Sequence, residues 1–222
     1  MRILLISATT MEVDPLIDYL RLHWIESATG TFTKGNCTVE ILITGVGMHR
    51  MAYALGRKLG LSKPDFCVNA GIAGAFPGKA SIGEVVHVTS EIIADFGAEN
   101  ARGDRLTPEA LGLEEDISSI NGLINRNAGQ YAFLKSVKGI TVNATHGSET
   151  SIRKMIEAFD PDVETMEGGA FFYCCMKTGT PFIEIRAISN LVEVRNRENW
   201  NIPLAVSKLN KQLLEMLQFF VG

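Results

Sequence analysis

The sequence has few of the features that membrane, metal or nucleic-acid sites require. Its four cysteines show no metal-type or redox-type spacing, and its lysines and arginines are scattered rather than gathered in a basic stripe. The net charge is −4. The apolar run at residues 3–6 is short and is followed by Glu12 and Asp14 without a cleavage pattern. We therefore expect a cytoplasmic protein with reduced thiols, no metal or other cofactor, no nucleic-acid or membrane partner, and a small-molecule ligand.

Length and composition set the fold class. The chain has 222 residues, 46% of them hydrophobic and 21% charged, which suits one globular domain with a substantial core. Strand-like runs such as residues 3–8 alternate with helical periodicity such as residues 12–22. No linker or low-complexity tract interrupts this alternation, so the sequence predicts a single α/β domain over residues 1–222.

A short apolar run meets a helix at residues 163–170, where the sequence reads Val-Glu-Thr-Met-Glu-Gly-Gly-Ala. Ligands of open α/β sheets gather at the carboxyl ends of strands, so such a turn offers Glu164 and Glu167 to a cleft. An acid favoured by the helix dipole is the simpler alternative. Two further strand ends also carry a polar group, namely Glu12 and Asn190, and together they favour a ligand site.

Two glycine-containing segments also follow predicted strands. Gly45-Val46-Gly47 precedes a helix, and either a ligand-facing turn or a plain strand-to-helix corner explains it. Residues 69–75 read Asn-Ala-Gly-Ile-Ala-Gly-Ala after a buried strand and are predicted to turn there. Their small side chains would let the main chain lie close to a ligand.

These motifs together resemble the purine nucleoside phosphorylase and nucleosidase superfamily, in which an M-E-G or M-E-A turn binds ribose and an I-S-D or I-S-N turn binds purine. The resemblance spans nearly the whole chain. It implies a three-layer α/β/α fold with a mixed, twisted central sheet, and a homo-oligomer, a dimer or larger. Within the superfamily, Glu12, Asn190 and the tail at residues 193–200 look most like the futalosine hydrolases, nucleosidases of the alternative menaquinone pathway.

The resemblance implies three catalytic roles. Glu12 would be the general base that deprotonates water for attack on C1′. Glu167 would hydrogen-bond a ribose hydroxyl and stabilise the cationic sugar, and Asn190 would donate to purine N7 and to a 6-oxo oxygen. Two carboxylates near one site are expected to raise the pKa of at least one of them.

The resemblance also implies substrate-binding residues, with Met166 as an apolar floor beside the sugar. The other predicted contacts are Gly47, Ala73, Gly74, Glu164 and Thr165. His146 stands near the place of a base-stacking aromatic, and either a substitute for it or a solvent-facing turn residue fits the sequence. Arg195 and Arg197 would hold the benzoate of futalosine, or else belong to a solvated charged loop.

The predicted reaction is hydrolysis of the N-glycosidic bond of a purine nucleoside, namely futalosine, to hypoxanthine and dehypoxanthine futalosine. Glu12 would repel phosphate at a helix start, which favours water as nucleophile. Three alternatives stay open. They are a methylthioadenosine or S-adenosylhomocysteine nucleosidase, whose base turn commonly has Asp at the position of Asn190, a purine nucleoside phosphorylase, and a non-catalytic nucleoside-binding protein.

Overall fold

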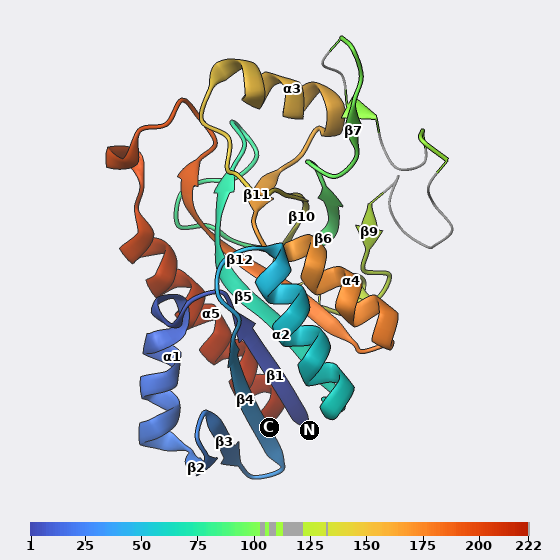
Figure 1. Ribbon diagram of the computed structural model, residues 1–222. Coiled ribbons are helices and arrows are strands. Elements are labelled where there is room, and N and C mark those ends of the chain that lie inside the picture. Colours follow the sequence, from blue (N-terminus) through green and yellow to red (C-terminus); the bar gives the residue numbers. More distant parts are fainter. Residues whose placement is uncertain (103–104, 107–109, 113–121, 132, 222) are drawn as a thin grey trace.

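A mixed β-sheet forms the centre of the molecule (Figure 1). The computed structural model describes residues 1–102, 105–106, 110–112, 122–131 and 133–221. The strands of the sheet are β1 (Arg2–Ser7), β2 (Ile25–Ala28), β3 (Thr31–Lys34), β4 (Cys37–Ile43), β5 (Phe66–Ala75), β6 (Val85–Ile93), β9 (Leu123–Ile124), β10 (Lys135–Thr141), β11 (Val163–Thr165) and β12 (Phe182–Leu191). Their order is β11-β10-β6-β12-β5-β1-β4-β3-β2, with β9 beside β6. A separate small ribbon pairs β7 (Ala98–Glu99) with β8 (Arg105–Leu106).

Helices lie on both faces of this sheet. Figure 1 shows α1 (Thr10–His23) and α5 (Ile202–Val221) on one side, and α2 (Met48–Leu61) and α4 (Gly168–Thr178) on the other. Each pair buries its apolar residues against the strands in a hydrophobic cluster of its own. The helix α3 (Glu149–Phe159) covers one end of the sheet, and η1 (Ala128–Tyr131) and η2 (Arg197–Asn199) are short 3-10 helices. The predicted three-layer α/β/α architecture with a mixed sheet is confirmed.

Helix boundaries follow from local chemistry. The apolar repeat Val13, Leu16, Ile17 and Leu20 buries one side of α1, as its spacing predicts. The Glu12 carboxylate accepts a hydrogen bond from the Thr9 backbone N–H, which satisfies a donor at the start of this helix. At α3, the Ser148 hydroxyl accepts from the Ser151 N–H and caps the start of the helix.

The turn predicted at residues 69–75 is wrong. These residues continue β5, which runs between β1 and β12 as a central strand. Small residues are needed here because neighbouring side chains pass over the strand. A Cβ at Gly71 would lie 2.1 Å from Arg186 Nη1, and a Cβ at Gly74 would lie 3.0 Å from Asn190 Nδ2. The glycine-rich sequence therefore marks a strand crossed by side chains.

The pairing of β11 closes one end of the sheet and positions the site. β11 runs parallel to β10 but also pairs antiparallel with the end of β5, where Glu164 lies opposite Gly74. On the other side of β5, Asn190 of β12 also lies opposite Gly74, after an irregularity between Ile188 and Asn190. Glu164 and Asn190 thus flank one glycine from two strands.

Among the described residues, none of the helices combines the length and apolar character that a membrane crossing requires.

Candidate active site

The Glu12 carboxylate is buried and held by four donors. Its Oε2 accepts hydrogen bonds from the hydroxyls of Ser7 at 3.1 Å and Thr9 at 2.8 Å, and from the Thr9 N–H at 2.9 Å. Its Oε1 accepts from the Ile72 N–H at 3.1 Å. Only 6% of the residue is exposed. Because β1, α1 and β5 each contribute, the carboxylate is fixed by the sheet and not by a flexible loop.

Glu167 lies at the start of α4 and points toward the α2 turn. Its Oε1 accepts a hydrogen bond from the Gly47 N–H at 2.8 Å. Gly47 has φ 105°, in the left-handed region that favours glycine, so the turn that aims this N–H depends on the missing side chain. Burial raises the pKa of Glu167, against the opposing influence of Arg186 and the Gly47 N–H, and Glu12 raises it further.

Arg186 connects these two acids. It is only 1% exposed on β12, and its Nε donates to Glu184 Oε1 at 2.9 Å. Burial disfavours the charge of the guanidinium, but the carboxylates around it outweigh that penalty and raise the pKa of Arg186. A Cβ on Gly71 would lie 2.1 Å from Arg186 Nη1 and 2.9 Å from Glu12 Oε1, so both groups converge over this glycine. We call Glu12, Glu167 and Arg186 the deep cluster.

Another buried carboxyl, that of Glu91, lies beneath the turn into α4. Glu91 accepts hydrogen bonds from the hydroxyls of Thr141 at 2.8 Å and Thr165 at 3.2 Å. These hydroxyls in turn accept from the Gly169 and Gly168 N–H groups of α4. Burial, and then the charge of Glu184, raise the pKa of Glu91 well above its ordinary value. This network fastens the start of α4, and hence the backbone that carries Glu167.

A recess lined by other residues, which we call the rim pocket, opens beside the deep cluster. It is lined by Gly74, Thr145, His146, Glu164, Asn190, Val192, Glu193, Arg195, Asn196 and Trp200. Gly74 is its floor, because Glu164 and Asn190 stand on the two strands that flank this residue. Neighbouring strands are spaced about 4.8 Å apart, which sets the backbones of these two walls about 10 Å apart. The space left by the glycine side chain lies between them.

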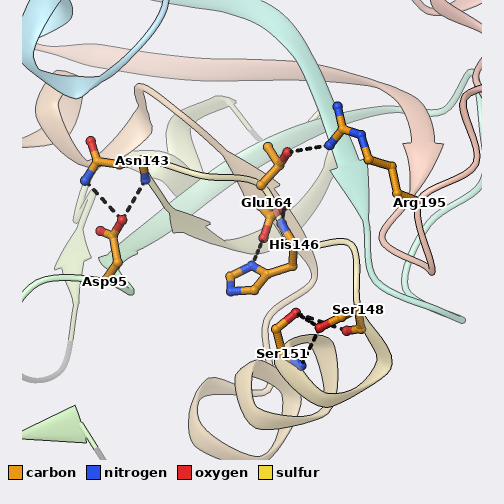
Figure 2. A network of polar contacts seen from close by, with 8 residues as sticks. Asp95, Asn143, His146, Ser148, Ser151, Glu164 and Arg195 are labelled. Carbon is orange, nitrogen blue, oxygen red and sulfur yellow. Dashed lines mark hydrogen bonds and ion pairs between the residues drawn. The ribbon is translucent and has the colours of Figure 1, made fainter. Parts of the chain in front are cut away.

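His146 is fastened to Glu164 in this pocket (Figure 2). The His146 N–H donates to Glu164 Oε1 at 3.0 Å, and the ring Nδ1 contacts Glu164 Oε2. The loop that carries His146 is anchored as well, since Asp95 Oδ2 accepts from both the N–H and the side-chain amide of Asn143 at 2.7 and 3.0 Å. The imidazole is therefore a positioned group.

Asn190 forms the opposite wall. Its Oδ1 accepts a hydrogen bond from the Ser189 hydroxyl at 2.8 Å, and its Nδ2 donates to the Leu191 carbonyl at 3.0 Å. An amide nitrogen carries two protons, so one N–H remains for a ligand. This arrangement presents Asn190 to the pocket as a donor.

The arginines lie at the mouth of the pocket. Arg195 Nη1 donates to the Thr145 hydroxyl at 3.3 Å, and its guanidinium lies 5.5 Å from the centre of the Trp200 ring. Arg197 lies 5.9 Å from the same ring and does not line the pocket. Both side chains are exposed. Their predicted contact with a benzoate stays a prediction, and the structure places Arg195 with Asn190 rather than with Glu12.

The predicted site residues divide between these two regions. Glu12, Glu167 and Gly47 gather at the deep cluster, and Gly74, His146, Glu164, Asn190 and Arg195 gather at the rim pocket. Met166 is half-buried next to Glu167, and the buried Ala73 accepts a hydrogen bond at its carbonyl from Ser189. Thr165 turns its hydroxyl inward to Glu91 and Thr141, on the opposite side of β11 from Glu164. The substrate contacts proposed for these residues stay predictions.

Sequence reasoning assigned no role to Arg186, Glu184 or Glu91. A signal was present, because Glu184 and Arg186 are charged residues two apart in an otherwise apolar strand and therefore share one face. Charged side chains are almost never buried unless they are paired. A charged pair at this spacing in a central strand thus indicates a buried ion pair. Here Glu184 pairs with Arg186 of the deep cluster.

The arrangement favours chemistry on a polar ligand that spans both regions. The deep cluster offers a fixed carboxylate as proton acceptor, a second carboxyl for hydroxyl groups, and a guanidinium. The rim pocket offers hydrogen-bond donors for a planar polar ring.

Comparison with known proteins agrees with this reading. The family model described as the phosphorylase superfamily matches residues 2–218. A futalosine hydrolase of Acidothermus cellulolyticus is 30% identical over 93% of this chain and 86% of its own length. A futalosine hydrolase of Thermus thermophilus is 29% identical over 79% of this chain and 80% of its own length. In fold, the chain resembles the crystal structure of Helicobacter pylori 5′-methylthioadenosine/S-adenosylhomocysteine nucleosidase, with a TM-score of 0.79, 15% identity, and coverage of 98% of this chain and 97% of that one.

Proposed function

The chain belongs to the phosphorylase superfamily, and we propose from this membership that it hydrolyses the N-glycosidic bond of futalosine to hypoxanthine and dehypoxanthine futalosine. The observation that carries the proposal is the convergence of Glu12 and Arg186 over Gly71, with Glu167 beside them and the Asn190 pocket adjacent. Two relatives that cover most of this chain are futalosine hydrolases, which supports the choice of substrate.

At the sugar, Glu12 accepts a proton from the attacking water as the water oxygen bonds to C1′. The hydrogen-bond donors around Glu12 fix the orientation of its carboxylate. The group therefore needs no reorientation before it accepts the proton of the water. Glu167 accepts a hydrogen bond from a ribose hydroxyl and stabilises the positive charge that develops on the ring. The Arg186 guanidinium is buried with these carboxyl groups and partly opposes the rise that burial causes in the pKa of Glu167.

At the base, the C1′–N9 bond breaks and its electron pair goes to the purine. Asn190 has one N–H left for a ligand and donates it to the 6-oxo oxygen of the purine. Arg195 extends the set of donors at the pocket mouth, from where its guanidinium can reach a 6-oxo oxygen or a carboxylate.

Water is the better nucleophile for this deep cluster than phosphate. A phosphate dianion beside Glu12 and Glu167 would face two buried carboxyl groups, and the guanidinium between them already balances Glu184. Water carries no charge and needs only the acceptor that Glu12 provides. The proposed product is therefore the free sugar and not a sugar 1-phosphate.

A 5′-methylthioadenosine or S-adenosylhomocysteine nucleosidase is the second candidate, because a nucleosidase of that name has the same fold. Both candidates use the same sugar chemistry and differ at the base. Asn190 favours a 6-oxopurine, since its free group is a donor and a 6-amino group offers no acceptor at that position.

One assay separates these candidates. The protein is incubated in parallel with futalosine, aminodeoxyfutalosine, methylthioadenosine and inosine, in phosphate-free buffer, and the released base is quantified. We expect hypoxanthine from futalosine at the highest kcat/KM. Faster cleavage of methylthioadenosine would reassign the substrate, a requirement for phosphate would make the protein a phosphorylase, and a bound but intact nucleoside would make it a sensor.

We further propose a homo-oligomer, a dimer or larger, in the cytoplasm. The outward sides of the packed helices α2 and α4 expose Tyr53, Leu61 and Tyr173, which a second copy could cover. The four cysteines are free thiols, which supports a reducing compartment. Sedimentation of only monomer at micromolar concentration would contradict the oligomer.

A further inference from the structure

We propose that His146, held by Glu164, donates the proton that leaves with the purine. This inference rests on the proposed function and extends it, because the Asn190 amide cannot supply that proton to the base. The proposal makes His146 the catalytic acid of the rim pocket and Glu164 the residue that positions it.

A proton donor is needed because a purine anion is a poor leaving group. When the C1′–N9 bond breaks, the electron pair moves into the base, and protonation at N7 lets the base depart as neutral hypoxanthine. Asn190 cannot do this, since an amide donates hydrogen bonds but does not release its proton. In this chain the residue with an acidic proton must therefore come from another wall of the pocket.

His146 occupies that wall. It and Asn190 line the same pocket, and the two strands that carry Glu164 and Asn190 pair with the same residue, Gly74. Because directly paired residues project to the same face of a sheet, Glu164 and Asn190 stand on the same side of β5. A purine over Gly74 therefore lies between the Asn190 amide and the imidazole that Glu164 holds.

The contact with Glu164 decides which nitrogen is available. Nδ1 contacts Glu164 Oε2, and a carboxylate accepts, so Nδ1 carries a proton. In the described part of the chain no group pairs with Nε2, and the side chain is 15% exposed. Nε2 is thus the nitrogen left to face a ligand. A carboxylate also stabilises the imidazolium, the form in which Nε2 carries the proton to be transferred.

The charged groups around the pocket set the pH response. Glu164 faces His146 from β11, and Glu193 and Arg195 line the pocket from the segment after β12.

During turnover the Nε2 proton passes to purine N7, the water proton passes to Glu12, and both groups return to their starting states by exchange with solvent. The reaction then consumes one water and releases neutral base and sugar, with no other reactant.

The structure explains why Glu164 is available for this task. Both of its oxygens are engaged by His146, one with the N–H and one with the ring, so Glu164 does not serve as a free ribose ligand. The loop that carries the imidazole is tied at Asn143 by Asp95 and at Gly147 by the Arg195 N–H. A donor fixed at both ends can protonate a leaving group without reorganisation.

The decisive experiment compares two leaving groups in His146→Gln. Futalosine needs a proton at N7, whereas N7-methylated futalosine carries its positive charge already and departs as neutral base without one. We expect kcat for futalosine to fall about 10²–10⁴-fold, the usual contribution of general acid catalysis, and kcat for the methylated substrate to fall less than fivefold. Equal losses on both substrates would overturn the proposal and leave His146 a shape or stacking residue.

Two further variants keep the result interpretable. His23→Gln changes an exposed histidine at the end of α1, and we expect its activity to be unchanged. Glu164→Gln keeps the shape but removes the carboxylate that accepts from the imidazole, so kcat for futalosine should fall while kcat for the N7-methylated substrate should change little. Equal effects of Glu164→Gln on the two substrates would contradict the positioning role.

Failure of the inference and failure of the proposed function are distinguishable. If the wild-type protein cleaves neither futalosine nor its methylated analogue, the proposed function is wrong. If it cleaves both and His146→Gln cleaves both as well as before, only the role of His146 is wrong. Asn190→Asp, which places a carboxyl on the opposite wall, should restore part of the lost futalosine activity in the His146→Gln background.

Discussion

The deep cluster and the rim pocket are built differently although they lie side by side. Glu12, Glu167 and Arg186 are all at least nine-tenths buried, with Arg186 on strand β12 and the two acids at the starts of α1 and α4. Arg195, by contrast, is exposed, and it and His146 come from loops that follow strands. The charges of the deep cluster therefore act in a low-dielectric interior, where they are strong and costly to disturb, whereas the charge of Arg195 at the rim is screened by water.

This difference suits the two tasks. Chemistry at C1′ requires a fixed base and fixed charges, which the interior of the sheet provides. Recognition of the base and its proton transfer require access to the ligand, which a pocket edge provides. Substitutions at the deep cluster should accordingly cost both catalysis and stability, whereas substitutions of the exposed residues at the rim should leave stability nearly unchanged.

The largest effect is expected from Glu12→Gln. The amide cannot take a proton from water, so kcat for futalosine hydrolysis should fall about 10²–10⁴-fold while KM changes little. Hypoxanthine release under saturating substrate measures it. Asp14→Asn, an exposed position on the same helix, is the matched control and should retain full activity. A loss below tenfold in Glu12→Gln would remove Glu12 from the role of base.

The second effect compares one substitution in both regions. Arg186→Met leaves Glu184 and Glu167 buried without their cation, and we expect the free energy of unfolding to fall by about 3–5 kcal/mol. Arg195→Met removes an exposed guanidinium and should change the free energy of unfolding by less than about 0.5 kcal/mol. Urea denaturation of the two variants tests this directly. Similar losses in both would show that the two regions do not differ in the way that their burial implies.

The third effect is a pH dependence beneath the α4 turn. The pKa of Glu91 lies well above its ordinary value of 4.5 in the folded protein. As pH rises above 4.5, the unfolded chain loses this proton while the folded protein keeps it, so stability falls by up to about 1.4 kcal/mol per pH unit until the folded carboxyl also ionises. Glu91→Gln removes this contribution, and its unfolding free energy should fall less steeply between pH 4.5 and neutral pH. Identical slopes of the unfolding free energy against pH in wild type and variant would refute this contribution of Glu91.

The smallest effect is expected for substrate selection at the rim. Arg195→Met should lower kcat/KM about tenfold for both futalosine and inosine, because Arg195 lies beside Asn190 at the base pocket. Arg197 lies over the same Trp200 ring but does not itself line the pocket, so Arg197→Met should lower kcat/KM less. A loss confined to futalosine would instead assign Arg195 to the benzoate, as the sequence predicted.

The sequence by itself determined several of the elements and their junctions. Residues 3–8, 12–22 and 163–170 carry periodic apolar patterns or a glycine turn, and these short-range signals follow from the geometry of strands and helices. They placed Glu12 and Glu167 correctly at strand and helix junctions, whereas the three-layer order was implied by the family resemblance. Local physics suffices there, because each pattern involves neighbours in the chain.

Tertiary structure alone decided how the polar groups meet. The antiparallel pairing of β11 with β5 sets Glu164 beside His146 and turns Thr165 toward Glu91, and it depends on residues about ninety positions apart. The pairing of β12 with β5 likewise puts Arg186 over Gly71 and makes residues 69–75 a strand instead of a turn. Strand order is a property of the whole sheet, and a one-residue change of register would move every side chain to the opposite face.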